Sequence, residues 1–264
     1  MININININI NINMNITVFT NCQGHFIYSY WLSSLPYFIN ANYTYIVNYG
    51  IIQYDPENVK KSDIFIYQPI EIGLDEILQH LKPECIKICL PVIYVDAFPI
   101  FEEDGKYVGG HTITKYIDKG MTLAEILHLY DMNKFDFELN ERFIKSIAYL
   151  QKKEHDYCNI KVSEFILAYY KTHKLFTTQN HPNGIIGCWV AKQICSILGI
   201  DFEMVDEFTQ DHREINGHIA WSNSNYMKLE LDMNYINFDD GYTEYRDHLI
   251  KVYNNRELIK YKYI

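Results

Sequence analysis

The chain has no apolar run long enough to cross a bilayer, and no basic segment followed by an apolar segment of the kind that directs secretion. We therefore expect a cytoplasmic protein with no membrane insertion. Positive charge is also scarce, because 23 Lys and Arg residues face 33 Asp and Glu residues and give a formal net charge of -10. A general nucleic-acid binder shows the opposite balance, so no nucleic-acid partner is expected.

Cysteine spacing typical of a metal site is lacking as well. Cys85 and Cys89 are far apart for a metal pair, they flank a strand-like run, and no matching Cys/His pair follows them, so no metal is expected. The cysteines lie mostly in apolar stretches, which is typical of reduced, buried thiols rather than of a disulfide framework. The chain has six, at positions 22, 85, 89, 158, 188 and 195.

The chain of 264 residues is 48% hydrophobic and can build a sizeable core. The opening MININININININMN alternates with the period of a strand, and we treat residues 1–15 as a low-complexity segment. Strand-like and helix-like runs then alternate, which favours an α/β fold with a doubly wound, mostly parallel sheet over residues 16–200. Residues 201–264 are polar and weakly periodic and are expected to wrap the same domain as an appendage.

The predicted elements follow from hydrophobic periodicity and from Pro and Gly breaks. The strands are expected at 16–20, 43–49, 64–67, 86–95 and 174–178, and a loop at 97–120. The helices are expected at 25–35, 75–81, 123–132, 141–153, 162–173 and 184–198.

The stretch ITVFTNCQGHF places small and polar residues between the first strand and the first helix, where open parallel sheets bind ligands. Cys22 would lie at a helix N-terminus, whose dipole lowers the pKa of a thiol. The backbone N–H groups of Gln23 and Gly24 would bind a developing oxyanion, and Gly24 also allows a close backbone approach. The alternative is a small buried Cys in a tight turn.

A second stretch, TTQNHPNGIIGCWVA, has a His between a strand-like and a helix-like run. His181, Pro182, Asn183 and Gly187 resemble the last motif of the SGNH/GDSL hydrolase superfamily. This resemblance implies an SGNH-like fold, in which His181 is the general base for a nucleophile on the turn after the first strand, the position of Cys22. We therefore expect the Cys22 and His181 side chains to meet above one sheet.

Three positions depart from that superfamily. Cys22 stands where the nucleophile is Ser, and Thr178 stands where an Asp precedes the His by three residues. A Cys–His dyad can act without that Asp, because a thiol needs less activation than a hydroxyl. Gln68 follows the third strand and is placed to supply an amide donor where the superfamily uses Asn.

The ordered set Asn-Cys-Gln, Gln-Pro and Asn-His-Pro-Asn resembles, more narrowly, the WcbI-type polysaccharide-biosynthesis proteins over roughly residues 16–200. The resemblance implies an acetyltransferase with coenzyme A or acetyl-CoA as co-substrate and a sugar as acceptor. An amino-deoxyhexose carried on a nucleotide is the acceptor that we expect. The bias toward Ile, Asn, Lys and Tyr is typical of an AT-rich genome. It would fit a large DNA virus that builds its own glycans in the host cytoplasm.

Coenzyme A is a polyanion and needs cations. The region from Lys134 to Lys174 has a local charge of +2 within a chain of -10. Its candidates for phosphate contacts are Arg142, Lys145, Lys152 and Lys153, with Arg favoured for bidentate geometry. The alternative is that they form the solvated faces of helices. His111, in a Gly-rich loop, and Asn183 complete the expected cofactor site.

Two other functions stay open at this point. An esterase, deacetylase or thioesterase would differ only in using water as the acceptor. A glycan-binding module without catalysis would keep Cys22 and His181 as packing residues.

Overall fold

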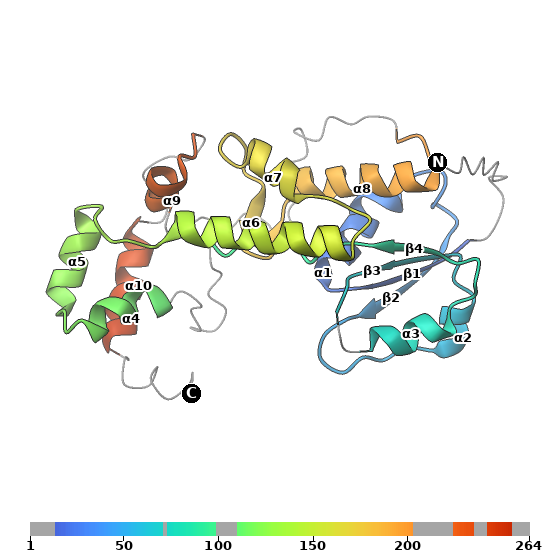
Figure 1. Cartoon of the computed structure of the whole chain (residues 1–264), viewed down its shortest axis with the longest axis horizontal. Helices are drawn as coiled ribbons and strands as arrows, with labels where there is room; N and C mark the ends of the chain where they lie inside the picture. Colours follow the sequence, from blue (N-terminus) through green and yellow to red (C-terminus); the bar gives the residue numbers. More distant parts are fainter. Residues whose placement is uncertain (1–13, 71–72, 99–109, 203–223, 235–241, 255–264) are drawn as a thin grey trace. The chain divides into compact units, whose positions relative to one another are not determined.

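The computed structural model describes residues 14–70, 73–98, 110–202, 224–234 and 242–254 (Figure 1). Most of the predicted 1–15 segment therefore lies outside the described residues. The described residues form two compact units. The first draws on residues 1–93, 148–168 and 181–217, and the second on residues 94–147, 169–180 and 218–264.

The first unit contains a four-stranded sheet in which every neighbouring pair is parallel, in the order β2-β1-β3-β4. Its strands are β1 (Asn15–Thr20), β2 (Asn42–Val47), β3 (Ile64–Tyr67) and β4 (Ile86–Cys89). The predicted α/β class with a parallel sheet is confirmed. β4 ends at Cys89 rather than at residue 95, because Pro91 has no N–H for the ladder.

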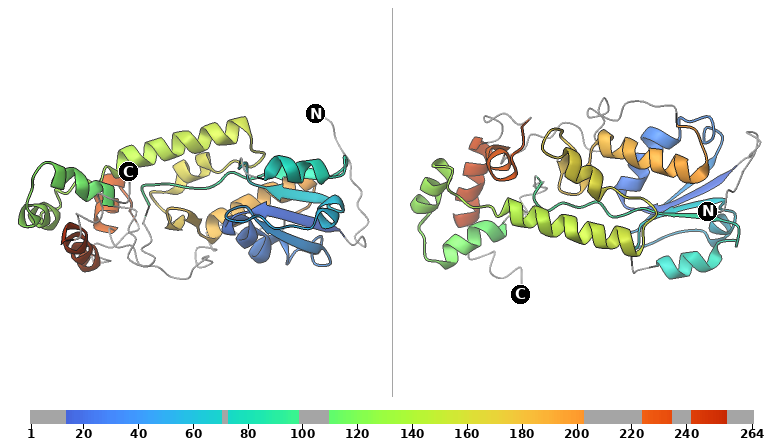
Figure 2. Two further views of the ribbon diagram at one scale, coloured as in Figure 1. Left: turned by 90° about the horizontal axis from the view of Figure 1, so that it is seen from below. Right: turned by 45° about the horizontal axis from the view of Figure 1, so that its top comes forward.

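Helices cover both faces of this sheet (Figures 1 and 2). One face carries α2 (Pro56–Lys60) and α3 (Leu74–His80), and the other carries α1 (Cys22–Ile27), its π-helical continuation η1 (Tyr28–Leu32) and α8 (Gly184–Leu198). The α2/α3 side packs through a cluster of Phe19, Ile46, Val59, Phe65, Ile77 and Cys85. Residues of β1 and β2 with the opposite orientation, such as Val18 and Tyr45, therefore face α1.

The outer edge of β4 is covered by the chain that follows α6 (Leu139–Asp156). The backbone N–H groups of Asn159 and Ile160 donate to the Cys89 carbonyl at 3.0 and 3.3 Å, and the Cys89 N–H donates to Asn159 Oδ1 at 2.8 Å. These bonds bring the Cys89 and Cys158 sulfurs to 3.9 Å. All six cysteines are free thiols, as expected, and only Cys22 among them is partly exposed.

The remaining elements are short or belong to the second unit. They are α4 (Gly110–Asp118), α5 (Leu123–Asp131), α7 (Ser163–Tyr169), α9 (Ser224–Leu231) and α10 (Tyr242–Asn254), with a two-stranded sheet of β5 (Phe176–Thr178) and β6 (His181–Pro182). α4 corrects the predicted loop at 97–120 over residues 110–118, because Gly110 begins a helix rather than preventing one. Residues 99–109 of that loop lie outside the described part of the chain. His111 accordingly lies in α4, and its side chain is outside the described part of the chain.

An aromatic core holds the second unit together. Tyr226 of α9 stacks on Tyr130 with ring centroids 5.2 Å apart, donates its hydroxyl to the Tyr130 carbonyl at 2.7 Å, and meets Phe137 edge-on at 4.6 Å. Glu230, also on α9, accepts from the Leu139 N–H at 2.8 Å, where α6 begins. The described helices of residues 201–264 thus pack within the second unit, while the predicted domain boundaries stay a prediction.

Candidate active site

The turn after β1 positions Cys22 as the first residue of a helix. The Asn21 side chain accepts a hydrogen bond from the Gln23 N–H at 3.0 Å, so α1 begins three residues before the predicted start at 25. An Asn at this position satisfies one of the N–H groups that have no partner within the helix. The same bond occupies the Gln23 N–H, which was one of the two expected oxyanion donors.

The Cys22 thiol lies half-buried at this helix start. Burial raises the pKa of Cys22 above its ordinary value, and the backbone N–H groups of Cys22 and Gln23 oppose the shift only in part. We had expected the helix N-terminus to lower this pKa. The six-residue α1 has too little effect to offset the loss of hydration. At neutral pH the thiol is therefore protonated and needs a base to become a nucleophile.

Two buried amides, Gln23 and Gln68, fix the geometry around Cys22. Gln68 Oε1 accepts from the Asn21 N–H at 2.9 Å and from Asn48 Nδ2 at 3.2 Å. Gln68 Nε2 donates to Gln23 Oε1 at 3.1 Å and to the Pro91 carbonyl at 3.4 Å. Gln68 therefore joins the loops that follow β1, β2, β3 and β4.

Gln23 extends this network to the segment after β4. Its Nε2 donates to the Ile93 carbonyl at 2.7 Å, and its Oε1 accepts from the Ile93 N–H at 3.1 Å. Gln23 and Gln68 are 1% and 0% exposed. Both hydrogens and both lone pairs of the Gln68 amide are already used. The predicted donation from Gln68 to a substrate therefore needs correction, and we assign both amides to positioning the Cys22 turn.

Gly24 has a packing role, and the oxyanion contact expected of its N–H stays a prediction. A Cβ at this position would lie 2.2 to 2.7 Å from side-chain atoms of Thr20. Gly24 therefore lies close to the last residue of β1, while the close approach expected of it in the site stays a prediction. Only a residue without a side chain lets α1 begin so close to the strand that precedes it.

The His-Pro-Asn segment leads into α8 in the same unit as Cys22. Asn183 is 0% exposed and caps α8, because its side chain accepts from the Ile185 N–H at 3.0 Å. Its expected place in the cofactor site stays a prediction. His181 lies in β6 and is partly buried. The meeting of the His181 imidazole with the Cys22 thiol stays a prediction.

Helix packing supports the placement of the two segments in one site. α1 and η1 both pack against α8. A Cβ on Gly187 would lie 2.6 Å from Trp31 Nε1 and 3.0 Å from Phe26 Cε1. The glycine of the second motif therefore allows the helix after His181 to pack closely against the helix that begins at Cys22.

Thr178 occupies the position where the SGNH superfamily has its Asp. Its side chain is 1% exposed, and its hydroxyl donates to Asn180 Oδ1 at 3.0 Å. The residue thus supplies a hydroxyl bound to a neighbouring amide, and it offers no carboxylate.

The expected phosphate contacts differ in how firmly they are held by other groups. Arg142 makes a bidentate pair with Asp96 at 2.8 and 2.9 Å and is only 18% exposed, so its guanidinium is already committed. Lys145 pairs with Glu141 on the helix surface at 2.5 Å. Lys153 lies over the rings of Tyr149 and Tyr157 at 5.5 and 5.3 Å, and Lys152 is exposed.

The sequence reasoning missed the aromatic residues beside Cys22. His25, one helical turn after Cys22, stacks on Tyr45 with ring centroids 4.7 Å apart. Its Nδ1 lies 2.9 Å from the Tyr43 hydroxyl. The available signals were the alternation of Tyr43 and Tyr45 on one face of a strand and the three-residue spacing of Cys22 and His25.

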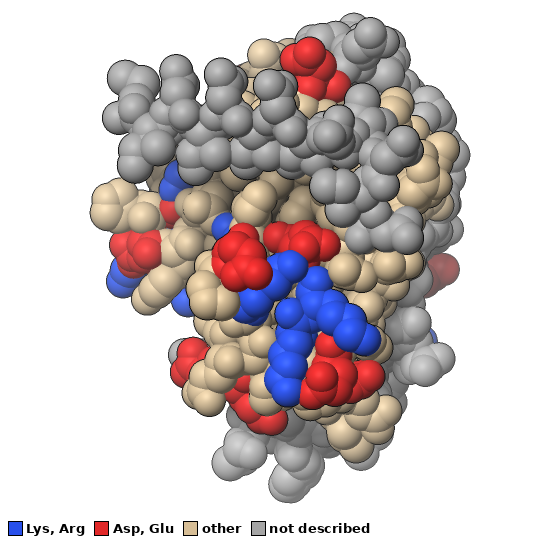
Figure 3. All heavy atoms as spheres, turned by 90° about the vertical axis from the view of Figure 1, so that its right-hand side faces the viewer, with Lys and Arg blue, Asp and Glu red and all other residues tan. Residues whose placement is uncertain are grey.

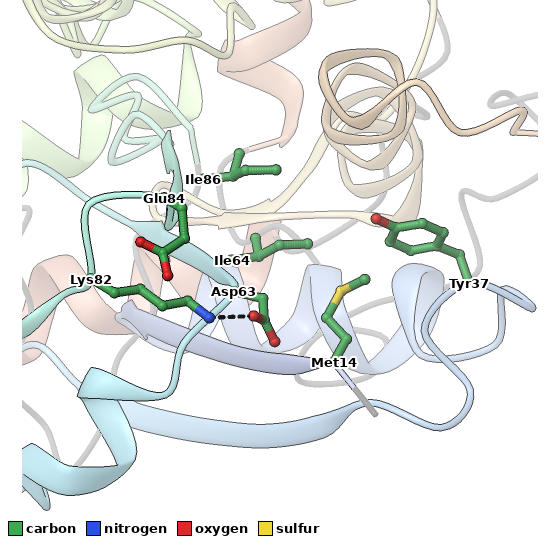
Figure 4. A pocket seen from close by; sticks show the side chains of 7 residues that line it. All are labelled: Met14, Tyr37, Asp63, Ile64, Lys82, Glu84 and Ile86. Atoms are coloured by element: carbon green, nitrogen blue, oxygen red, sulfur yellow. Dashed lines mark hydrogen bonds and ion pairs between the residues drawn. The ribbon is translucent and has the colours of Figure 1, made fainter. Parts of the chain in front are cut away.

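A cavity of about 220 Å³ lies at the opposite end of the strands (Figure 4). Lys82 and Asp63 point toward each other across it, with their atoms 2.5 Å apart. On this side of the molecule basic and acidic side chains are interspersed (Figure 3). The cavity is lined by Met14, Tyr37, Asp63, Ile64, Lys82, Glu84 and Ile86.

The described residues give no sign of a metal or membrane site. Within them, no three His, Cys, Asp or Glu side chains are grouped to hold a metal ion. Nor does that part of the chain contain a helix both long and apolar enough to span a bilayer.

Comparison with known proteins agrees with this architecture. A family model described as "Polysaccharide biosynthesis enzyme WcbI" matches residues 15–203, whereas no curated protein matches the chain. A solved structure of WcbI is similar with a TM-score of 0.70 and 14% identity, covering 92% of this chain and 91% of that one. That structure is described as native protein without a disulfide bond between coenzyme A and a cysteine. The chain belongs to the WcbI family of polysaccharide biosynthesis enzymes.

Proposed function

We propose that the chain transfers an acetyl group from acetyl-CoA to a sugar, namely the amine of an amino-deoxyhexose carried on a nucleotide. The observation that carries the proposal is the position of Cys22. It is the one partly exposed thiol of the six, and the Gln23–Gln68 network holds it where parallel strands end. The description of the WcbI structure, which refers to coenzyme A and a cysteine, supports the same chemistry.

In the first version of the mechanism, His181 takes the proton of the Cys22 thiol, and Cys22 Sγ attacks the thioester carbonyl. The C–S bond of acetyl-CoA breaks, and coenzyme A leaves as a thiolate that accepts a proton from His181. The sugar amine then attacks the acetyl-Cys22 thioester, the bond between the acetyl carbon and Cys22 Sγ breaks, and His181 passes the proton that the amine loses to the Cys22 thiolate. The raised pKa of Cys22 is consistent with this requirement for a base.

In the second version, His181 deprotonates the sugar amine, which attacks acetyl-CoA directly while Cys22 shapes the site. Trapping an acetylated Cys22 by rapid quenching and mass spectrometry would support the first version. Full activity in Cys22→Ala would support the second.

Exposed cations on α6 would hold the phosphates of coenzyme A. Lys152 and Lys153 suit this role, because neither has an acidic side chain within ion-pair distance among the described residues. Lys145 is available as well, since an exposed i,i+4 pair is worth little and is easily exchanged. Arg142 is less available, because binding a phosphate would break its bidentate pair with Asp96.

Calorimetry with coenzyme A and acetyl-CoA tests the proposal before any acceptor is known. We expect saturable binding of both. Turnover of p-nitrophenyl acetate without binding of either ligand would instead identify a hydrolase. If the protein bound neither coenzyme A nor acetyl-CoA and did not hydrolyse p-nitrophenyl acetate, the glycan-binding module would be the remaining function.

A further inference from the structure

Tyr45 presents a hydroxyl that makes no hydrogen bond with any residue that the structure describes. Other tyrosines nearby differ in this respect. The Tyr43 hydroxyl lies 2.9 Å from His25 Nδ1, and the Tyr54 hydroxyl donates to Glu76 at 2.8 Å. Tyr45 is nevertheless partly buried. A partly buried phenol without a protein partner is available to a ligand.

Tyr45 lies on the same face of the sheet as α1, close enough to Cys22 for the two groups to interact electrostatically. Tyr45 pairs with Val18 of β1, on the face of the sheet that carries α1. Its ring stacks on His25 at 4.7 Å, with an interplanar angle of 26°. His25 and Cys22 are three residues apart on α1 and so lie on the same side of the helix.

The protonation state of Tyr45 suits a donor. Burial, together with the neighbouring Tyr49 and Cys22, raises the pKa of Tyr45 to about 12. The phenol therefore keeps its proton at neutral pH, even when the adjacent thiol ionises.

The reaction needs such a donor because the turn supplies fewer than expected. When a nucleophile attacks a thioester, an electron pair moves onto the carbonyl oxygen, which must be stabilised by hydrogen bonds. The Gln23 N–H was expected to help, but it donates to Asn21 Oδ1 at 3.0 Å. A donor from β2 would take its place.

We propose that Tyr45 donates a hydrogen bond from its hydroxyl to the acetyl carbonyl oxygen of acetyl-CoA, with His25 holding its ring in place. The inference rests on the proposed acetyl transfer and names a further residue of that site. No proton is transferred by Tyr45. The electron pair on the oxygen returns to carbon as the C–S bond of coenzyme A breaks, and the hydrogen bond weakens again.

Calorimetry with two coenzyme A analogues isolates this bond. One is the ketone analogue of acetyl-CoA in which methylene replaces the thioester sulfur, so it keeps the carbonyl but cannot transfer the acetyl group. The other is S-ethyl-coenzyme A, which lacks the carbonyl oxygen. We expect the wild-type protein to bind the ketone about fivefold more tightly, the worth of one neutral hydrogen bond.

Tyr45→Phe should abolish this preference and leave the affinity for S-ethyl-coenzyme A unchanged, because the phenylalanine ring can still stack on His25. Tyr54→Phe, which loses a hydroxyl bound to Glu76, should retain the preference. As a second measurement, the carbon-13 resonance of the labelled ketone carbonyl should move downfield on binding to wild type and less in Tyr45→Phe.

An unchanged preference and an unchanged carbonyl shift in Tyr45→Phe would overturn the role of Tyr45 and leave the proposed function standing. Failure of the wild-type protein to bind either analogue would overturn both. A wild-type protein that binds the two analogues equally would refute this inference alone.

Discussion

The two ends of the sheet in the first unit are stabilised in different ways. At the amino ends of β1, β3 and β4, a cavity of about 220 Å³ contains an ion pair between Lys82 and Asp63. At the carboxyl ends, the neutral amides of Gln23 and Gln68 bond to one another and to backbone groups. The first end is hollow and charged, while the second, among the described residues, is built around neutral amides that bond to one another.

If the reaction takes place over Cys22, as we propose, the difference means that a cavity alone does not mark the reactive end of a parallel sheet. The charged groups in the cavity already have partners, and their side chains are 28% and 35% exposed. The carboxyl end has instead a rigid frame that leaves one thiol and one phenol available. Burying that frame without unpaired polar atoms is what allows Cys22 to be held in one position.

Removing the His181 imidazole should give the largest difference in activity between the two ends of the sheet. We expect His181→Ala to lower acetyl transfer by about 10²- to 10⁴-fold, because both versions of the mechanism use His181 as the base. The matched change His80→Ala, at the end of α3 and near Lys82, should leave the rate within about twofold. Steady-state kinetics with acetyl-CoA measures both. Equal effects of the two substitutions would remove the distinction between the ends.

Replacing Gln68 and Lys82 each by Met compares how much the interactions at the two ends of the sheet stabilise the fold. Gln68→Met deletes four hydrogen bonds in a site with 0% exposure and should lower the free energy of unfolding by about 2–4 kcal/mol. Lys82→Met breaks a partly exposed ion pair and should cost less than about 1 kcal/mol. Urea denaturation gives both values. The comparison is reversed if Lys82→Met proves the more damaging.

The close approach at Gly24 should be sensitive to a single methyl group. Gly24→Ala places a Cβ against Thr20 and should lower the free energy of unfolding by about 1–3 kcal/mol. The double variant Gly24→Ala, Thr20→Ala removes the two nearest clashing atoms, Oγ1 and Cγ2, but keeps the Thr20 Cβ at 2.7 Å, so it should recover only part of that loss. Without such a recovery, the contact with Thr20 would not be the reason for a glycine here.

The smallest effect on stability is expected when the pH is lowered and Asp63, at the amino end of the sheet, is protonated. Burial alone would raise the pKa of Asp63, but bonds from Asn15 and Lys82 outweigh it and hold the pKa below the ordinary value. The ionised carboxylate thus stabilises the fold above its unfolded-state pKa, and the contribution is lost as pH falls through the lower folded-state pKa. Solvent screening limits it to less than about 1 kcal/mol.

Asp63→Asn should remove this dependence. Unfolding followed between about pH 5 and pH 2 should show a steeper loss of stability in the wild-type protein than in the variant. Parallel curves would mean that Asp63 contributes no acid sensitivity.

Much of the framework was predictable because it depends on local patterns. The strand at 64–67 and the helix at 184–198 have the bounds that periodicity predicts. α1 was placed three residues late because Gly24 resembles a break in the pattern, although Asn21 is a good cap. α4 was missed for a similar reason, since its first residue is Gly110.

The partners of the site residues could not be predicted from local sequence. Gln68 meets Gln23 because β1 and β3 are paired with Phe19 opposite Tyr67, and this register is a property of the whole sheet. The raised pKa of Cys22 depends on burial by the surrounding fold, which outweighs the helix start. Tyr45 likewise gains its place beside Cys22 only through the pairing of β2 with β1.

The central claim is that coenzyme A binds over Cys22, and protection from alkylation tests it most directly. Desulfo-coenzyme A has no thiol and so does not consume iodoacetamide, whose reaction with each cysteine can be followed by mass spectrometry. We predict that saturating desulfo-coenzyme A slows the alkylation of Cys22 by about tenfold or more, as expected for a thiol covered by a bound ligand. Alkylation of Cys22 at the same rate with and without the ligand would contradict the account.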